Sequence, residues 1–235
     1  MRINFRTRYN LRVMEESRNN YVRAEFHCHT VYSPDSLVKV RDLLDACAVK
    51  GVTKLAITDH GAMGGAFEAK ALAPERIVLA EEIQTTEGEL LAYFMTEPIP
   101  QYLPVMEVIE RLKAQGAYIS IAHPYDPYRG SHWEDETLEA IAPFVDGVEV
   151  FNARCIRQSF NDKAYAFAKA HDLQTLVGSD AHSLREIGNA TLSMPDFNSP
   201  EELRESLKQA EFSGELSGAW VRVLSTYAKF AKKLF

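Results

Sequence analysis

Short apolar runs alternate along the chain with segments that have helical spacing. The runs are four to eight residues long and rich in Val, Ile, Leu, Phe or Tyr, which is typical of buried strands. They predict seven strands, at 22–27, 54–58, 76–83, 88–94, 117–122, 147–151 and 174–179.

The intervening segments place apolar residues three and four positions apart, which is the spacing of one helix face. They predict helices at 37–50, 104–115, 161–171, 199–210 and 217–234. Gly51 and Gly116 supply the ends of the first two helices. Asn161 is expected to cap the third, and Ser199 with Glu202 forms a predicted capping box for the fourth.

Strands that alternate with helices indicate an α/β architecture with parallel strands. Because no GxGxxG loop follows a strand, a closed or nearly closed barrel is favoured over a dinucleotide-binding sheet. We expect a basic arm at 1–21, one barrel domain at 22–215 and an amphipathic helix at 216–235 that packs on the barrel. The apolar stripe of that helix comprises Trp220, Val223, Leu224, Tyr227, Phe230, Ala231 and Leu234.

The charge of the chain is unevenly distributed. The net charge is −7, yet residues 1–23 and 217–235 each carry +4, which leaves −15 on residues 24–216. Such an acidic body repels polyanions, so a nucleic-acid groove across it is disfavoured. The basic ends either neutralise the acidic body or contact phosphate or an anionic surface.

Composition favours a soluble protein of the cytoplasm. Apolar residues make up 46% of the 235 residues and charged residues 25%, as in ordinary globular proteins. The three cysteines, Cys28, Cys47 and Cys155, have no paired spacing and indicate a reducing compartment. No apolar run reaches the length of about 18 residues that would cross a membrane, and no secretory signal is apparent.

Histidines are concentrated at the ends of the predicted strands. Five of the seven lie there or a few residues beyond, namely His27, His29, His60, His123 and His182. The carboxyl ends of parallel barrel strands share one rim, where active sites form, so we expect these side chains to meet in one pocket. His27 and His29 alternate with Cys28, which predicts that both imidazoles point to the same face.

Acidic residues accompany these histidines. Glu81 and Glu82 end the third strand, and Asp180 precedes His182 by two positions. Alternation directs only one of the two glutamates inward, and we favour Glu82, whose carboxylate could bridge two cations. Imidazole and carboxylate groups together suit divalent transition metals. A structural core would not repeatedly place such groups at strand ends, because burying them unpaired costs free energy.

The motifs HCHT with Ser33-Pro34-Asp35, TDH, EI, AHP and SDAH occur in this order. The set resembles the polymerase and histidinol phosphatase (PHP) family of metal-dependent phosphoesterases over about residues 22–190. The resemblance implies a distorted, TIM-like (β/α)7 barrel that holds two or three divalent metal ions (Mn²⁺, Zn²⁺ or Fe²⁺). It implies a first metal on His27, His29, Glu82 and Asp180, a second on Glu82 and His123, and a third on Asp35, His60 and His182.

One position departs from the family pattern. Many family members have a histidine where the fourth strand opens, and this chain has Glu89 there. A glutamate ligand to the second metal would favour a harder cation such as Mn²⁺ over Zn²⁺. Alternatively, Glu89 is displaced and the second metal site is weaker.

Four further residues are candidates for binding the substrate. Arg129 and Arg154 lie in the segments after the fifth and sixth strands, where a planar guanidinium suits a phosphate group. Asn152 could hydrogen-bond the nucleophile or the substrate, and Arg185 is a weaker candidate. Surface salt bridges are the alternative explanation for the arginines.

The leading hypothesis is a metal-dependent phosphoric ester hydrolase that acts on a small phosphorylated substrate, a phosphomonoester or a nucleotide-type molecule. The expected nucleophile is a hydroxide held by the metals, and Asp180, His182 and His60 are the expected catalytic residues. Either histidine could protonate the leaving group. One alternative is an oligonucleotide exonuclease or phosphodiesterase of the same family, and the other is a non-catalytic regulatory module stabilised by metal.

Overall fold

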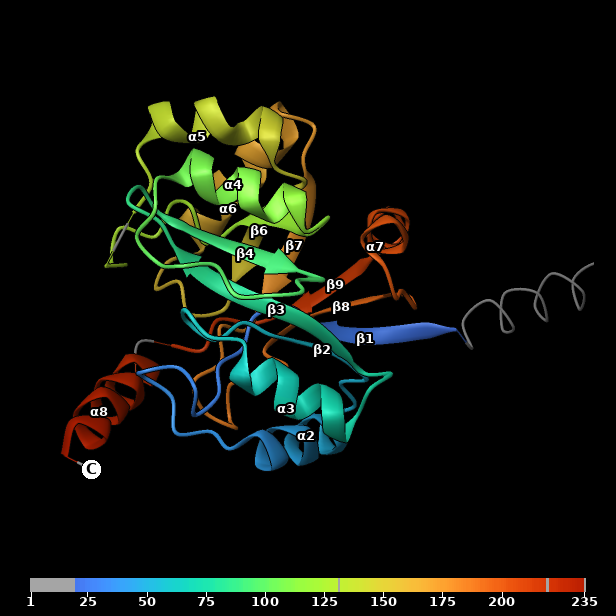
Figure 1. The fold of residues 1–235 in the computed structure, drawn as a ribbon, viewed down its shortest axis with the longest axis vertical. Coiled ribbons are helices and arrows are strands. Elements are labelled where there is room, and N and C mark those ends of the chain that lie inside the picture. The colour runs from blue at the N-terminus through green and yellow to red at the C-terminus, as the bar shows by residue number, and fades with distance from the viewer. Residues whose placement is uncertain (1–19, 131, 219, 235) are drawn as a thin grey trace, which may run out of the picture.

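The computed structural model describes residues 20–130, 132–218 and 220–234, and the strands within these ranges form one nine-stranded sheet (Figure 1). The strands are β1 (Tyr21–Glu25), β2 (Lys54–Ile57), β3 (Ile77–Gln84), β4 (Glu89–Tyr93), β5 (Tyr118–Ile121), β6 (Gly147–Asn152), β7 (Gln174–Gly178), β8 (Ala190–Pro195) and β9 (Glu211–Gly214). Their order in the sheet is β7-β6-β5-β4-β3-β2-β1-β8-β9.

The sheet curls until its first and seventh strands meet. Just beyond β1, Cys28 forms a parallel bridge with Ala181, which follows β7. The amide of His29 donates to the carbonyl of Ala181 at 2.8 Å, and the amide of Ala181 donates to the carbonyl of His27 at 3.3 Å. The prediction of a single α/β domain with a nearly closed barrel is therefore confirmed.

Strand β4 differs from the predicted parallel arrangement. It runs antiparallel to both β3 and β5, whereas β1, β2 and β3 are parallel to one another, as are β5, β6 and β7. The cause is the short connection 85–88, because a parallel crossover needs a dozen or more residues. As a consequence, β4 begins at the rim where β3 and β5 end. The sequence did not predict β8 and β9, which extend the sheet beyond β1 in antiparallel pairing.

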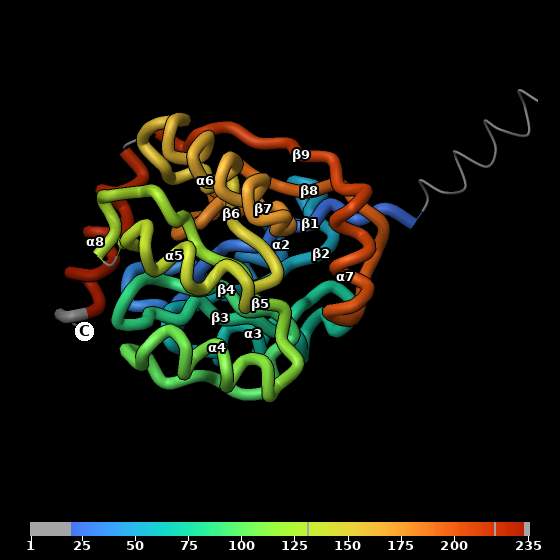
Figure 2. Tube along the Cα trace, turned by 90° about the horizontal axis from the view of Figure 1, so that it is seen from above, coloured from blue at the N-terminus to red at the C-terminus, as the bar shows by residue number. Residues whose placement is uncertain are grey.

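Helices surround the sheet (Figures 1 and 2). They are α2 (Val40–Val49), α3 (Gly64–Leu72), α4 (Val105–Ala114), α5 (Asp135–Ile141), the 3-10 helix η1 (Ala142–Phe144), α6 (Gln158–Ala170), α7 (Pro200–Leu207) and α8 (Val221–Leu234). The five predicted helices are present, whereas α3 and α5 were not predicted. Ser199 caps α7, and its hydroxyl accepts the amide hydrogen of Glu202 at 3.1 Å. Asn161 is no cap, because α6 begins three residues before it.

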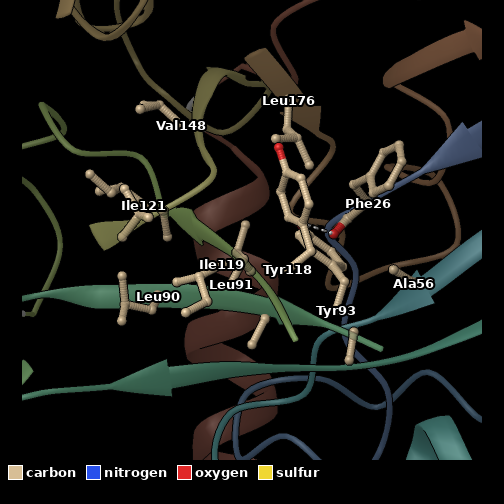
Figure 3. Packing of buried hydrophobic residues seen from close by; sticks show 14 of the residues in the cluster. Phe26, Ala56, Leu90, Leu91, Tyr93, Tyr118, Ile119, Ile121, Val148 and Leu176 are labelled. Carbon is tan, nitrogen blue, oxygen red and sulfur yellow. Dashed lines mark hydrogen bonds between the residues drawn. The ribbon is translucent and has the colours of Figure 1, made fainter. Parts of the chain in front are cut away.

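Aromatic side chains fill much of the barrel interior. Tyr93, Tyr118 and Phe26 are fully buried. The rings of Phe26 and Tyr93 meet edge to face with centroids 5.5 Å apart. The hydroxyl of Tyr93 also donates to the backbone carbonyl of Phe26 at 3.1 Å (Figure 3). This contact ties β4 to the segment that carries the first pair of histidines. The three cysteines are buried and unpaired.

Helix α8 lies at one end of the barrel, and α7 lies at the opposite end (Figures 1 and 2). The apolar stripe of α8 faces outward, and Val223, Tyr227 and Phe230 are exposed by 68%, 66% and 62%. Val221 and Ala228, on another face of α8, are buried. The helix therefore contacts the barrel through the side that carries Val221, Ser225, Ala228 and Lys232. No helix among the described residues has the length and hydropathy needed to cross a membrane, and most of the basic arm 1–21 lies outside the described residues.

We expect Tyr93→Phe to lower the free energy of unfolding by about 1–2 kcal/mol, because it removes a buried hydrogen bond to the backbone. The matched control is Tyr118→Phe, because the Tyr118 hydroxyl donates to the partly buried side-chain oxygen Oε1 of Gln174 at 3.2 Å. Water can replace that partner more readily, so Tyr118→Phe should lower the free energy of unfolding by less. Urea unfolding of both variants measures the difference, and an equal or larger loss for Tyr118→Phe would contradict this account.

Candidate metal centre

The nine predicted metal ligands come together at the rim of the barrel. Six come from parallel strand ends: His27 and His29 after β1, His60 after β2, His123 after β5, and Asp180 and His182 after β7. The other three are Glu82 within β3, Glu89 at the start of β4 and Asp35 in the loop after β1. Eight of these residues are buried, and His60 is partly exposed.

Glu82 is the centre of the cluster. Its Oε2 lies 3.2 Å from Nε2 of His27, 3.3 Å from Nε2 of His29 and 3.1 Å from Nδ1 of His60. Its Oε1 lies 3.0 Å from Nε2 of His123. One carboxylate thus has two oxygens directed at different imidazoles, as a bridge between two cations requires.

Two aspartates hold the other side of the cluster. Asp180 Oδ1 lies 3.3 Å from Nε2 of His29 and 3.4 Å from Nδ1 of His182. Asp35 Oδ1 lies 3.2 Å from Nε2 of His182, and its Oδ2 lies 3.7 Å from Nε2 of His60. The loop residue Asp35 is therefore within reach of the two histidines with which the resemblance grouped it.

Glu89 also reaches the cluster. Its Oε2 lies 3.6 Å from Nε2 of His123, and Glu89, His60 and Glu82 form one of the groups able to share an ion. Glu89 arrives there because β4 is antiparallel, which brings the start of this strand to the rim. Glu81 is directed elsewhere, and its carboxylate accepts the amide hydrogen of Ile99 at 3.0 Å.

The side chains fit divalent cations. The ligand atoms in each of four groups lie within 4.8 Å of one another: His29, His60 and His182; His27, His29 and Glu82; His27, His123 and Asp180; His60, Glu82 and Glu89. Three ligand atoms are buried without a hydrogen-bond partner, namely Nε2 of His29, Oδ1 of Asp35 and Oδ1 of Asp180. Buried polar atoms that lack a partner are costly, and a cation would satisfy all three.

Protonation also suits metal binding at several positions. Burial, with the nearby His182 and His60, lowers the pKa of His29 to about 3, so its imidazole is neutral. Burial opposes ionisation of Glu82, but His27 and His60 outweigh it and hold the Glu82 pKa well below its usual range. Neutral imidazoles and ionised carboxylates are the forms that bind metal.

The pKa of His27 is shifted in the opposite direction to that of His29. Burial opposes a positive charge on its ring, yet Glu82, Glu149 and Asp180 together raise the His27 pKa well above its ordinary value. A proton and a metal cation therefore compete for the same field of negative charge, and metal binding should release the proton.

Two ligands have strained backbone conformations. His123 has φ 24° and Asp180 has φ 50°, in the left-handed region that residues other than glycine rarely adopt. Such conformations cost about 1–3 kcal/mol each and are concentrated at functional sites. The amide of His123 is held by a hydrogen bond to Oε2 of Glu149 at 2.9 Å, so the surrounding structure compensates the strain.

Family models match the chain over most of its length. A model described as "PHP domain" matches residues 25–179, and one described as "PHP-associated" matches residues 158–212. The chain belongs to the PHP domain family. The uncharacterized protein MJ0417 of Methanocaldococcus jannaschii is 34% identical over 197 residues, which cover 80% of this chain and 79% of that protein. MJ1587 of the same organism is 38% identical over 148 residues, which cover 56% of this chain and 82% of that protein.

Solved structures share the PHP fold. A two-domain protein from Bacteroides vulgatus, which contains a predicted PHP-like metal-dependent phosphoesterase, matches with a TM-score of 0.67 and 18% identity over 83% of this chain and 65% of its own. The lesion-specific endonuclease PfuEndoQ from Pyrococcus furiosus matches with a TM-score of 0.60 and 16% identity over 82% of this chain and 57% of its own. These likenesses confirm the expected barrel.

The predicted substrate-binding residues of this PHP domain differ in how deeply they are buried. Arg129 is partly exposed, and its Nη2 lies 2.6 Å from Oδ2 of Asp180. Arg154 is buried, with Nη1 2.6 Å from Nδ1 of His182. Asn152 is fully buried. Its amide donates to Asp180 at 3.2 Å and its carbonyl oxygen accepts from Arg129 at 3.2 Å. This geometry favours a supporting role for Asn152 over direct contact with a substrate.

The sequence analysis missed Glu149, which supports the metal ligands from within β6. Its Oε1 lies 2.8 Å from Nδ1 of His27, which leaves Nε2 of that ring directed at the cluster. Gly178 of β7 makes room for this pair, since a Cβ there would collide with His27 and with Glu149. A buried acid within an apolar strand was the available signal. Ser33 plays a similar part, with its hydroxyl 3.1 Å from Nδ1 of His29.

We expect Glu149→Gln to weaken Mn²⁺ binding by about 10–100-fold, because the amide no longer holds the His27 ring in the orientation that a ligand needs. Calorimetric titration with Mn²⁺ measures this loss. The control is the same substitution at Glu139, an exposed residue of α5, which should leave the affinity unchanged. Equal affinities for all three proteins would show that Glu149 does not orient a ligand.

Proposed function

We propose that this PHP domain protein is a metal-dependent phosphoesterase that hydrolyses a small phosphorylated substrate with two or three divalent cations. The observation that carries the proposal is the meeting of nine histidine and carboxylate side chains beside one open pocket. Asp35, His60, Glu89 and His182 reach the wall of that pocket, whose volume is about 220 Å³. A second pocket of about 320 Å³ shares Asp35, His60 and Glu89 with it.

The proposed metal ligands are those that the sequence indicated, with Glu82 as the bridge and Glu89 as an additional ligand near His123. Bound divalent cations would supply Lewis-acid chemistry, which neutralises charge on the phosphate and lowers the pKa of water. The mixture of imidazole and carboxylate oxygen ligands suits Mn²⁺, Fe²⁺ or Zn²⁺, and the extra carboxylate of Glu89 favours Mn²⁺.

The protein's own groups position the substrate and move the proton. Arg129 faces the pocket beside Asp180 and is placed to bind the phosphate oxygens. His60 and His182 also face the pocket, and whichever of them is not held by metal could supply the proton that the leaving oxygen takes up. Burial and the charge of Arg154 lower the pKa of His182. Arg154 and Asn152 are buried, so we assign them to holding His182 and Asp180 in place.

We expect the protein to hydrolyse a generic aryl phosphate when Mn²⁺ is added. Asp180→Asn should lower kcat/KM by at least about 100-fold, because the substitution removes a charged ligand. The matched control is Asp162→Asn on the exposed surface of α6, which should retain activity. Circular dichroism checks that the folds are retained. Absence of hydrolysis by the wild type with Mn²⁺, Fe²⁺ or Zn²⁺ would exclude the proposal, and a loss of stability alone in Asp180→Asn would favour the non-catalytic module.

The nuclease alternative has one observation in its favour, which is the shared fold of the lesion-specific endonuclease. The acidic body of the chain counts against a long polyanionic substrate. Cleavage of a labelled oligonucleotide with a steep dependence on salt, at a rate above that of the aryl phosphate, would reverse this ranking.

A further inference from the structure

The polar side of α8 forms one wall of the pocket beside the metal centre. Four of its residues line that pocket, namely Arg222, Ser225, Thr226 and Lys229. From the sequence, this helix was predicted to pack on the barrel. Arg222 and Lys229 are seven positions apart, which is two helical turns, so both cations lie on the same face of α8.

Carboxylates of the barrel orient these two cations. Arg222 Nη2 lies 2.9 Å from Oδ2 of Asp126, which is also 3.0 Å from Nε of Arg129. Two guanidinium groups thus share one carboxylate. Lys229 Nζ lies 3.5 Å from Oδ2 of Asp35. Once Asp35 serves as a metal ligand, its charge is already compensated.

Contacts at both ends fix α8 relative to the metal centre. Near its start, Arg154 donates to the carbonyl of Val221 at 3.2 Å and to the hydroxyl of Ser225 at 2.9 Å. Near its end, Lys232 donates to the carbonyls of Val31 and Ser33, in the loop that follows the first two histidines. Because the helix is held at both ends, the cations between them have a defined position over the pocket.

We propose that Arg222 and Lys229 form an anion subsite that binds a second anionic group of the substrate, distinct from the phosphate that is hydrolysed. The inference rests on the proposed phosphoesterase function and narrows its substrate class to small phosphate monoesters that carry a further phosphate or carboxylate group. The scissile phosphate lies against the metal centre and Arg129, and the second anion lies against α8. Arg222 and Lys229 can each bind either a phosphate or a carboxylate group. The subsite therefore recognises anionic charge.

A pair of phosphonates tests the subsite by binding alone. Calorimetry in the presence of Mn²⁺ compares propylphosphonate, with one anionic group, and propane-1,3-diphosphonate, with two. We expect the wild type to bind the diphosphonate at least about tenfold more tightly, because the second group gains charge-assisted hydrogen bonds. Arg222→Gln and Lys229→Gln should each reduce that preference by about tenfold.

The matched control is Lys208→Gln, which removes the same charge directly after α7, the helix at the opposite end of the barrel (Figure 1). This variant should keep the wild-type preference. A wild type that binds both phosphonates equally, or that binds neither, would overturn the subsite. Equal loss of preference in Lys208→Gln would also overturn it, because general electrostatic attraction would then explain the effect.

Hydrolysis is measured separately, so the two proposals can fail independently. Turnover of the aryl phosphate without preference for the diphosphonate would retain the phosphoesterase function and reject the subsite. Preference for the diphosphonate without turnover of any phosphate ester would retain the subsite as a binding site and reject the proposed function. When both hold, 3-phosphoglycerate should have a higher kcat/KM than propyl phosphate in the wild type, and Lys229→Gln should reduce that ratio.

Discussion

The burial of Glu82 among four imidazoles is the constraint on which the rest of the centre depends. An ionised carboxylate leaves water at a large cost unless positive charge or hydrogen bonds replace its solvation. Here the carboxylate is surrounded by rings from the ends of three other strands. The barrel must close to bring those strand ends together, and the bridge between Cys28 and Ala181 provides that closure. The fold and the charge of Glu82 therefore stabilise the same arrangement.

The sequence could predict most of the centre because parallel strands impose a simple rule. When strands run parallel, whatever follows each strand lies on one rim, so His60, His123 and Asp180 could be brought together without any knowledge of strand order. Alternation within a strand then separated Glu82 from Glu81 correctly. These inferences depend on local spacing and on one property of the fold.

Other features depend on departures from regular geometry. Glu89 reaches the rim through the antiparallel direction of β4, which the short connection 85–88 could have indicated. In a regular strand, Glu149 and Asn152 would point to opposite faces, since three positions separate them. The register of β6 against β7 shifts between Glu149 and Phe151. That irregularity lets the amide of Asn152 donate to Glu149 at 3.0 Å, and apolar spacing gives no sign of it.

Buried apolar residues and charge together hold α8 at the rim. The helix packs on the barrel through Val221 and Ala228, while Val223 and Tyr227 are exposed and Arg222 and Lys229 line the pocket. The body of the chain carries −15, and its rim concentrates several of those carboxylates. Packing Arg222 and Lys229 against Asp126 and Asp35 lowers the repulsion within the rim. It also gives an incoming anion a positively charged wall, without which the acidic body would repel the kind of substrate that the metal centre suits.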